Sequence, residues 1–256
     1  MQNSDIENEL SKLNPVSLDS LYSVRLMNRV EIKYVFNIRK LPDLIRMLAI
    51  NYQVLEIRNM RMLPYFTTYL DTSDYLLYSQ HVRGEFARYK LRYRKYEATD
   101  ESFLEIKKKS NKGRTNKWRI ENINNSGSFD SEATCFILKH LPVSPVLLKP
   151  AIMNNFTRIT LAGFELNERI TIDFNISFSS SENFREISLP FLAIAELKKD
   201  GYSDYSRFRA LVKQLNIYPA GFSKYCIGSA LLNDSVKKNM IKPKLLLLNK
   251  LENECN

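Results

Sequence analysis

The chain has 256 residues, of which 44% are hydrophobic, and a formal charge of +10 from 38 Lys and Arg residues against 28 Asp and Glu residues. This length and apolar content exclude a disordered chain and suit one large domain or two small ones. The charge predicts an anionic ligand, which composition alone leaves open between nucleic acid, lipid headgroups and phosphates.

The sequence lacks the marks of several common classes of protein. Residues 1–10 have neither a basic start nor an apolar segment, and no run approaches the ~20 apolar residues that span a bilayer. We therefore expect a soluble cytoplasmic protein, free or peripheral at the inner face of a membrane. Three widely spaced cysteines and two histidines disfavour a Cys/His metal site and a Ser-His-Asp triad. Without a glycine-rich phosphate loop, any phosphate must be bound by side chains.

The predicted elements alternate between many strands and a few helices. We expect a flexible N-terminal segment at 1–20, a folded domain at 21–236 and a C-terminal tail at 237–256. Strands are predicted at 29–36, 65–71, 82–97, 101–109, 116–123, 156–163, 165–178 and 191–199. Helices are predicted to begin at Pro42, after a capping Ser73, at Ser131, near Ser203 and at Ser223. Because no regular βαβ alternation is visible, the fold class is α+β with an antiparallel sheet.

Charged residues alternate with apolar ones along six of these strands. In 86–94, Arg88, Lys90, Arg92 and Arg94 share one parity, and Ala87, Tyr89, Leu91 and Tyr93 share the other. Side chains of one parity point to one face of a strand, so the four cations form a row in which an anion is favoured. The other ionic faces hold Arg29, Glu31 and Lys33; Glu105, Lys107 and Lys109; Lys117 and Arg119; Arg169, Thr171, Asp173 and Asn175; and Glu196 and Lys198.

Two arrangements of these ionic faces fit the pattern. An open sheet would turn them toward water. A barrel would turn them inward, with the apolar faces packed outward against helices, and would form a tunnel lined with cations. At an effective dielectric of ~20, each cation–phosphate pair gains on the order of 4 kcal/mol before desolvation, so several pairs would hold a triphosphate. An isolated carboxylate such as Glu196 suits a divalent metal that bridges phosphate oxygens.

Seven motifs in order resemble the VTC-type polyphosphate polymerase domain, a branch of the triphosphate tunnel metalloenzymes. They are Arg29-x-Glu31-x-Lys33, Arg88-x-Lys90-x-Arg92-x-Arg94, Phe103-Leu-Glu105-Ile-Lys107, Arg158, Arg169-Ile-Thr-Ile-Asp173, Ala195-Glu196-Leu-Lys198 and Phe222-Ser223-Lys224-Tyr225. The resemblance covers roughly residues 25–232. Arg29 stands where the wider superfamily often has Glu, which fits the polymerase branch and argues against a thiamine triphosphatase or an adenylate cyclase.

The resemblance implies an antiparallel eight-stranded β-barrel tunnel, flanked by helices, that binds ATP with Mn or Mg. The implied reaction transfers the terminal phosphoryl group of ATP to a growing polyphosphate chain. The catalytic cations that grip phosphate are then Lys33, Arg92, Arg94, Lys107, Arg158 and Arg169. The metal ligand is Glu196, with Glu31, Glu105 and Asp173 as candidates for a second ligand. Further phosphate-binding candidates are Arg29, Arg88, Lys90, Arg119, Lys198, and Ser223 and Lys224 at a helix start.

The expected partners are ATP and polyphosphate or pyrophosphate. Nucleic acid is disfavoured because the aromatic residues fall on the apolar parity and no RNP-type motif occurs. The SPX domain and membrane segments of yeast-type assemblies are not visible in the sequence, so a membrane-protein partner is left open. Two alternatives also remain, a triphosphatase or polyphosphatase of the same fold and a catalytically silent polyphosphate-binding subunit.

Overall fold

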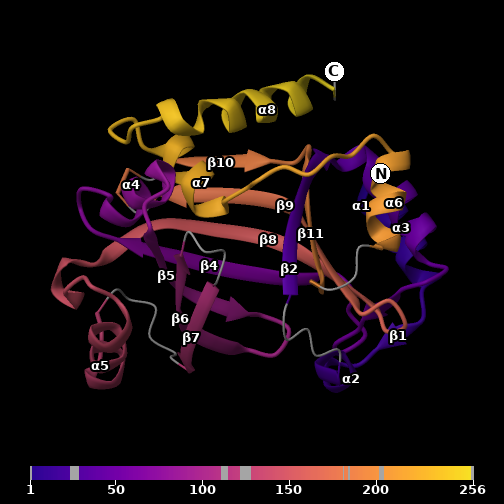
Figure 1. Cartoon of the computed structure of the whole chain (residues 1–256), viewed down its shortest axis with the longest axis horizontal. Coiled ribbons are helices and arrows are strands. Elements are labelled where there is room, and N and C mark those ends of the chain that lie inside the picture. The colour runs from indigo at the N-terminus through magenta and orange to yellow at the C-terminus, as the bar shows by residue number, and fades with distance from the viewer. Residues whose placement is uncertain are drawn as a thin grey trace.

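One curled antiparallel sheet dominates the molecule (Figure 1). The structure, a computed structural model, describes residues 2–23, 29–110, 115–121, 128–180, 182–183, 185–201 and 205–254. The main path of the sheet has the hydrogen-bonded strand order β2-β11-β9-β8-β4-β5-β6-β7. The bounds are β2 (Arg29–Asn37), β4 (Leu63–Asp71), β5 (Ala87–Tyr96), β6 (Glu101–Ser110), β7 (Thr115–Glu121), β8 (Lys149–Gly163), β9 (Glu168–Ser180) and β11 (Leu192–Asp200). Short strands β3 (Gln53–Leu55) and β10 (Glu186–Leu189) pair with β8 and β9 of this path, and β1 (Pro15–Val16) pairs in parallel with β3.

The sheet curls into a half-barrel flanked by helices. The register of β8 shifts against β9 between Asn155 and Thr157, and such irregularities bend a strand and increase its twist. Among the described residues, β2 and β7 end the hydrogen-bonded path and do not pair with each other. A side-chain ion pair spans the opening, with Lys107 Nζ of β6 3.5 Å from Glu31 Oε2 of β2. The antiparallel α+β fold is confirmed, and an ion pair between β6 and β2 spans its opening.

Helices cover the apolar outer face of this sheet, as the alternation predicts. The helices are α1 (Gln2–Ser11), α2 (Leu18–Ser23), α3 (Leu41–Leu48), α4 (Leu76–Arg83), α5 (Ser131–His140), α6 (Arg207–Gln214), α7 (Lys224–Leu232) and α8 (Lys242–Asn253), with 3-10 turns at Ile38–Lys40, Pro145–Leu147 and Asn239–Ile241. On one side, Leu44 of α3 and Phe208 of α6 share a buried cluster with Ile172 of β9. On the other, Ile137 of α5 packs in a cluster with Leu91 of β5.

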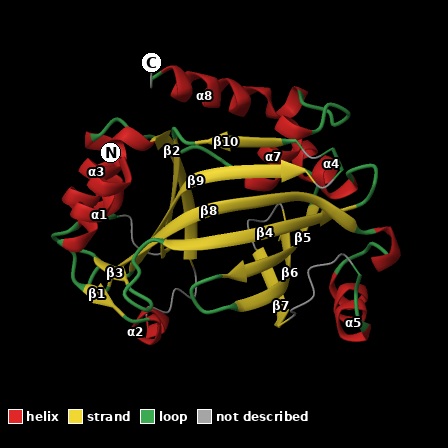
Figure 2. Ribbon diagram, turned by 180° about the vertical axis from the view of Figure 1, so that it is seen from behind, coloured by secondary structure: helices red, strands yellow, loops and turns green. Residues whose placement is uncertain are grey.

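Helix α7 instead packs into the concave side of the sheet. Phe156 has the same parity as Arg158 on β8, and it shares a buried cluster with Tyr225 and Ile227 of α7. The approach is close at Gly228, where a Cβ atom would lie 2.6 Å from the Phe178 ring, so only glycine fits. Helix α8 and strand β10 lie on the same side of the molecule as α7 (Figure 2). The helix start at Ser223 and Lys224 is thereby held inside the half-barrel.

Both ends of the chain contribute to the core, contrary to the expectation that they are peripheral. The segment expected to be flexible, 1–20, holds α1, whose Ile6 and Leu10 are buried against α3. The segment expected to be a tail, 237–256, holds α8, whose Leu248 and Leu251 are buried. Asn37 Nδ2 donates a hydrogen bond to the Leu251 carbonyl over 2.8 Å and fixes that helix to β2. No helix among the described residues is long and apolar enough to cross a membrane.

Two predicted element starts and one predicted helix cap were wrong for physical reasons. The strand predicted at 82–97 begins at Ala87, because α4 runs to Arg83 and ends at Gly84, whose φ of 71° suits glycine. Ser73 does not cap α4. Thr72 Oγ1 accepts from the Leu76 N–H at 3.0 Å, and Asp71 accepts from the next two N–H groups of the helix. Helix α6, expected near Ser203, begins at Arg207 with Ser206 as its cap. Residues 202–204 lie outside the described part of the chain, as do 122–127 of the predicted strand end and loop.

Candidate functional site

The concave face of the half-barrel, here called the lumen, gathers the predicted ionic faces. The register places charged residues of one parity opposite each other from strand to strand, for example Lys33 with Glu196 and Arg158 with Asp173. Each of the eight strands on the main path contributes polar or charged side chains to this face. The contributors are Glu31 and Lys33, Glu196 and Lys198, Arg169, Thr171 and Asp173, Arg158, Thr67, Lys90, Arg92 and Arg94, Glu105 and Lys107, and Lys117.

Strands β2 and β11 form a block of alternating charge in the lumen. Lys33 is in register with Glu196 and contacts it, and Lys198 Nζ lies 3.0 Å from the other oxygen of Glu196. Glu31 is in register with Lys198 and pairs with Lys107 across the opening. Each carboxylate of this block therefore has lysines beside it, and each lysine has a carboxylate opposite.

A second cluster surrounds Asp173 on β9. The guanidinium of Arg158 donates two parallel hydrogen bonds to its carboxylate, at 2.6 Å from Nε and 2.8 Å from Nη2. Lys224 at the start of α7 contacts the same carboxylate. Burial would raise the pKa of Asp173, but the two cations outweigh burial and hold that pKa well below its usual range. Asp173 is thus an anion that positions two phosphate-binding candidates.

A third cluster surrounds Glu105 on β6, whose side chain is 1% exposed. Arg92 of β5 donates to Glu105 Oε2 from Nε at 2.8 Å and approaches it with Nη2 at 2.6 Å. Lys117 of β7 contacts the other carboxylate oxygen. Burial opposes ionisation of Glu105, but Arg92, Arg94 and Lys117 keep its pKa far below the usual value. Lys117 was not among the predicted site residues, and only the strand order reveals its role.

The start of α7 is positioned by contacts that could not be predicted from the sequence. Ser223 caps the helix by accepting from the Cys226 N–H at 3.2 Å, and Lys90 Nζ donates to Ser223 Oγ at 2.9 Å. Asp71, fully buried at the end of β4, accepts from backbone N–H groups of α4 and from the Tyr225 hydroxyl. Asp71 therefore joins α4 to α7 and is a positioning residue.

Burial, together with neighbouring cations, lowers the pKa values of the lumen lysines. Burial lowers the pKa of Lys33 to about 7, with Lys107, Lys198 and Lys224 adding to the effect. Burial likewise lowers the pKa of Lys224 to about 7 and that of Lys90 to about 8. An anion placed among these side chains would favour their charged forms, so its binding should take up protons near neutral pH.

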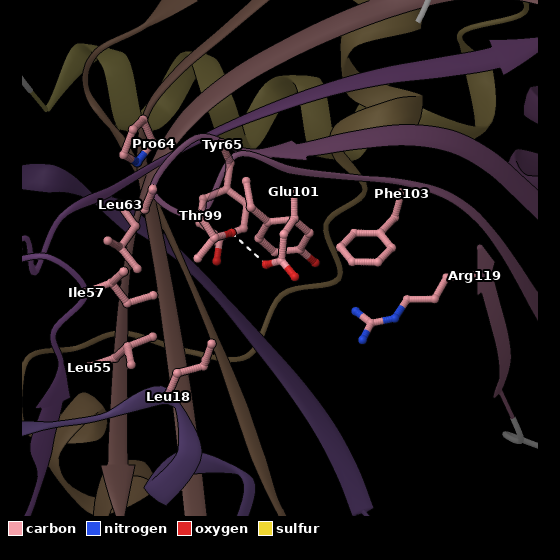
Figure 3. Close-up of a pocket in the computed structure, with 12 residues that line it drawn as sticks. Leu18, Leu55, Ile57, Leu63, Pro64, Tyr65, Thr99, Glu101, Phe103 and Arg119 are labelled. Atoms are coloured by element: carbon pink, nitrogen blue, oxygen red, sulfur yellow. Dashed lines mark hydrogen bonds between the residues drawn. The ribbon is translucent and has the colours of Figure 1, made fainter. Parts of the chain in front are cut away.

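The two ends of the lumen differ in character. One end, here called the basic mouth, is lined by Arg88, Lys90, Lys107, Lys109, Lys244 and the loop 219–223. His81 also lines it, and burial next to Lys90 and Arg88 lowers the pKa of His81 to about 2, so this imidazole is neutral. The other end, here called the end pocket, is lined by aliphatic and aromatic side chains together with Arg119 (Figure 3). Strands β5, β6 and β7 run from one end to the other.

The remaining predicted residues take less central places. Arg88 lies at the basic mouth, and Arg119 lies over Phe103 at the end pocket. Arg169 is in register with Lys198 and has the parity of Thr171 and Asp173. Arg29 begins β2, and its side chain lies outside the described part of the structure. The sequence therefore selected one face correctly, while the division of that face into a centre and two ends comes from the structure.

The carboxylates are too dispersed for a metal cage made of protein groups alone. Among the described residues, no three His, Cys, Asp or Glu side chains converge to hold an ion. Mg²⁺, however, is commonly bound by one or two carboxylates together with substrate phosphates. Glu196, partly exposed in the lumen between Lys33 and Lys198, fits that kind of shared site, with Glu31 diagonal to it in the register.

The fold is a curled antiparallel half-barrel of the tunnel class, and every strand of the main path except β4 contributes a cation to its concave face. The sequence profile of the VTC domain matches residues 28–127 and 137–233, and the chain belongs to this family. This match confirms the family predicted from the seven motifs.

Solved structures of similar fold are remote in sequence. A candidate adenylate cyclase from Bacillus halodurans is 18% identical, with a TM-score of 0.50, covering 77% of this chain and 96% of that one. A candidate adenylate cyclase from Vibrio parahaemolyticus is 14% identical, with a TM-score of 0.47, covering 79% and 99%. A Hippeastrum protein, described as a candidate adenylyl cyclase with a dominant triphosphatase activity, is 15% identical, with a TM-score of 0.46, covering 80% and 96%. No curated protein sequence matches the chain significantly. These likenesses concern the fold alone.

Proposed function

We propose that the chain is a metal-dependent polyphosphate polymerase that transfers the terminal phosphoryl group of ATP to a polyphosphate chain held in the lumen. The observation that carries this proposal is the convergence of cations on one concave face, from strands and from the start of α7. Family membership supports the class of ligand. The folded unit that does this corresponds to residues 21–236, now extended by the packing of α1 and α8.

The carboxylates of the lumen stabilise its cations before a phosphate ligand binds. Lys33, Lys107, Arg92, Arg158 and Lys224 each contact a carboxylate in the anion-free protein. Phosphate oxygens can replace or share those carboxylates, because charge-assisted hydrogen bonds from Arg and Lys serve either acceptor. The cations are therefore preorganised at fixed spacing along the strands, which favours in-line positioning of a phosphate chain.

Catalysis in this proposal consists of positioning and neutralisation of charge, with no covalent protein intermediate. Lys33, Arg92, Arg94, Lys107, Arg158 and Arg169 hold the phosphates, and Arg88, Lys90, Lys198, Ser223 and Lys224 extend the track. Glu196 would hold the divalent ion, which when bound offsets negative charge on the phosphates it touches. A membrane-protein partner enters the proposal only as a protein through which the polyphosphate product could be released.

The openings at both ends of the lumen support elongation over simple hydrolysis. From Lys90 to Tyr96, the lumen face of β5 spans about 20 Å at the usual rise of ~3.3 Å per residue. A product chain can therefore leave through the basic mouth while donor nucleotide occupies the rest of the lumen. A triphosphatase would need no such track of cations beyond the reacting phosphate.

The test is to incubate the purified protein with ATP and Mn²⁺ and to separate the products by gel electrophoresis. We expect long polyphosphate, and we expect Lys33→Ala and Arg92→Ala to weaken tripolyphosphate binding. Release of free phosphate alone would favour the triphosphatase, and tripolyphosphate binding without any turnover would favour the silent binding subunit. Unchanged affinity in both variants would contradict the assignment of the lumen.

A further inference from the structure

The end pocket differs in chemistry from the rest of the lumen. One wall is aliphatic, with Leu18, Leu55, Ile57 and Leu63, and the opposite wall carries Tyr65 and Phe103 (Figure 3). Leu55 and Leu63 are almost fully buried, whereas Glu101 and Arg119 are exposed at the rim. A pocket with an apolar floor and a polar rim suits a flat, uncharged group of a ligand rather than phosphate.

The aromatic wall is a fixed edge-to-face array. The Tyr96 ring stands against Tyr65 with centroids 5.1 Å apart and against Phe103 with centroids 5.8 Å apart. The guanidinium of Arg119 lies 4.5 Å from the Phe103 centroid. Such contacts hold the Phe103 ring in place, and its position in the pocket lining makes it a platform for stacking.

The end pocket also begins where the row of phosphate-binding cations ends. Tyr65 lines the pocket, and its ring centroid lies 4.9 Å from Arg158 Cζ and 5.8 Å from Arg94 Cζ. A ligand that places anionic groups at Arg158 and Arg94 would therefore bring whatever is attached to them to Tyr65. A molecule with an anionic tail and a flat heterocyclic head is a nucleotide.

We propose that the end pocket binds the base of the donor nucleotide, which fixes the polarity of the lumen. The base lies against Phe103 and Tyr96, the phosphates run past Arg158 and Arg94, and the terminal phosphoryl group points toward the basic mouth. The Glu101 carboxylate accepts from the Thr99 hydroxyl at 2.6 Å and retains acceptor capacity for an exocyclic amino group of the base. This assignment rests on the proposed function, because it presupposes that phosphates bind in the lumen.

The variant Phe103→Ala tests binding of the base separately from binding of the phosphates. Calorimetric titration should show ATP binding about tenfold weaker, as expected for loss of one stacked ring, and tripolyphosphate binding unchanged. The matched control is Phe86→Ala, since Phe86 is exposed and precedes the other end of β5. We expect it to change neither affinity. Equal weakening of both ligands, or unchanged ATP affinity, would overturn the base site.

Photolabelling of the wild-type chain with 8-azido-ATP provides a measurement that needs no variant. Label should fall within 96–103, and an excess of ATP should suppress it more effectively than an excess of tripolyphosphate that occupies the phosphate track equally. Label concentrated at the basic mouth would reverse the proposed polarity and refute it. If the wild-type chain binds ATP but not tripolyphosphate, the phosphate track of the proposed function fails, and if it binds tripolyphosphate without selectivity through Phe103, only the base site fails.

Discussion

Glu105→Gln should lower the stability of the anion-free protein and at the same time strengthen anion binding. The substitution keeps the shape of the side chain and removes a charge that contacts Arg92 and Lys117. Breaking a buried ion pair on one side costs about 3–5 kcal/mol, because the remaining charge loses its partner. We expect about 3 kcal/mol, the lower end of that range, since Arg92 and Lys117 keep some contact with water.

The assay is thermal denaturation followed by circular dichroism, with and without tripolyphosphate and without divalent metal. For a chain of this size, 1 kcal/mol shifts Tm by roughly 2–4 °C, so the variant should melt about 6–12 °C lower. Tripolyphosphate should raise the Tm of the variant by more than it raises the Tm of the wild type. The reason is that the anion neutralises the two cations that the substitution leaves unpaired. Its affinity should rise about tenfold, which corresponds to ~1.4 kcal/mol.

Glu165→Gln is the matched control, because Glu165 is exposed in the turn between β8 and β9 and should leave Tm and affinity unchanged. Two results would refute the reasoning about Glu105→Gln. The first is an unchanged Tm, which would mean that Glu105 does not stabilise the cations. The second is a folded variant that binds tripolyphosphate more weakly, which would mean that Glu105 supports the ligand directly.

Three further predictions concern the metal, the pH dependence and the placement of α7. Glu196→Gln should abolish metal-dependent turnover and retain tripolyphosphate binding without metal, measured by calorimetry; loss of both in a folded variant would count against a metal role. Because burial lowers the pKa of Lys90 to about 8 and a bound anion would raise it, tripolyphosphate affinity should fall as pH rises from about 7 to 9, and a profile that Lys90→Arg does not flatten would contradict this. The same lowered pKa, against an ordinary 10.5, means that burying charged Lys90 destabilises the anion-free protein below about pH 8, and that its stability should rise as pH increases from about 8 to 10.5. Tyr225→Phe should cost about 1–3 kcal/mol in a melt and weaken anion binding, because the Asp71 carboxylate loses the donor that holds α7; a variant with wild-type Tm would show that Asp71 does not position the helix.

Alternation along single strands was the part of the site that the sequence could predict. The parity of Arg92, Lys107 and Glu196 requires only that each segment is extended, since the side-chain period of a strand is two residues whatever its neighbours are. The family motifs then indicated that these faces meet. Their convergence on one concave side confirms both steps.

Partners across strands could not be predicted in this way. The pairing of Arg158 with Asp173 and of Lys117 with Glu105 depends on strand order and register, which follow from the packing of the whole chain. The role of Asp71 depends on Tyr225, which is far away in sequence. Asp71 also accepts hydrogen bonds from N–H groups at the start of α4, which is why the prediction of Ser73 as the cap was wrong.

The terminal helices were missed although their sequences carry a weak signal. Ile6, Leu10 and Leu13 repeat at helical spacing, yet the polar residues between them dominate the composition of 1–20. In α8, Leu248 and Leu251 are three positions apart, but they occur among lysines and asparagines near the end of the chain. Burial of so few side chains is enough to order each helix, because each docks on a preformed sheet or helix.

Transfer of the terminal phosphoryl group is tested most directly with ATP labelled separately at the α- and γ-phosphorus. A polymerase lumen predicts that, with Mn²⁺, label from the γ-position enters chains that lengthen with time, while label from the α-position stays in nucleotide. Label from the γ-position that passes only into orthophosphate, with no lengthening chain at any time, would contradict it.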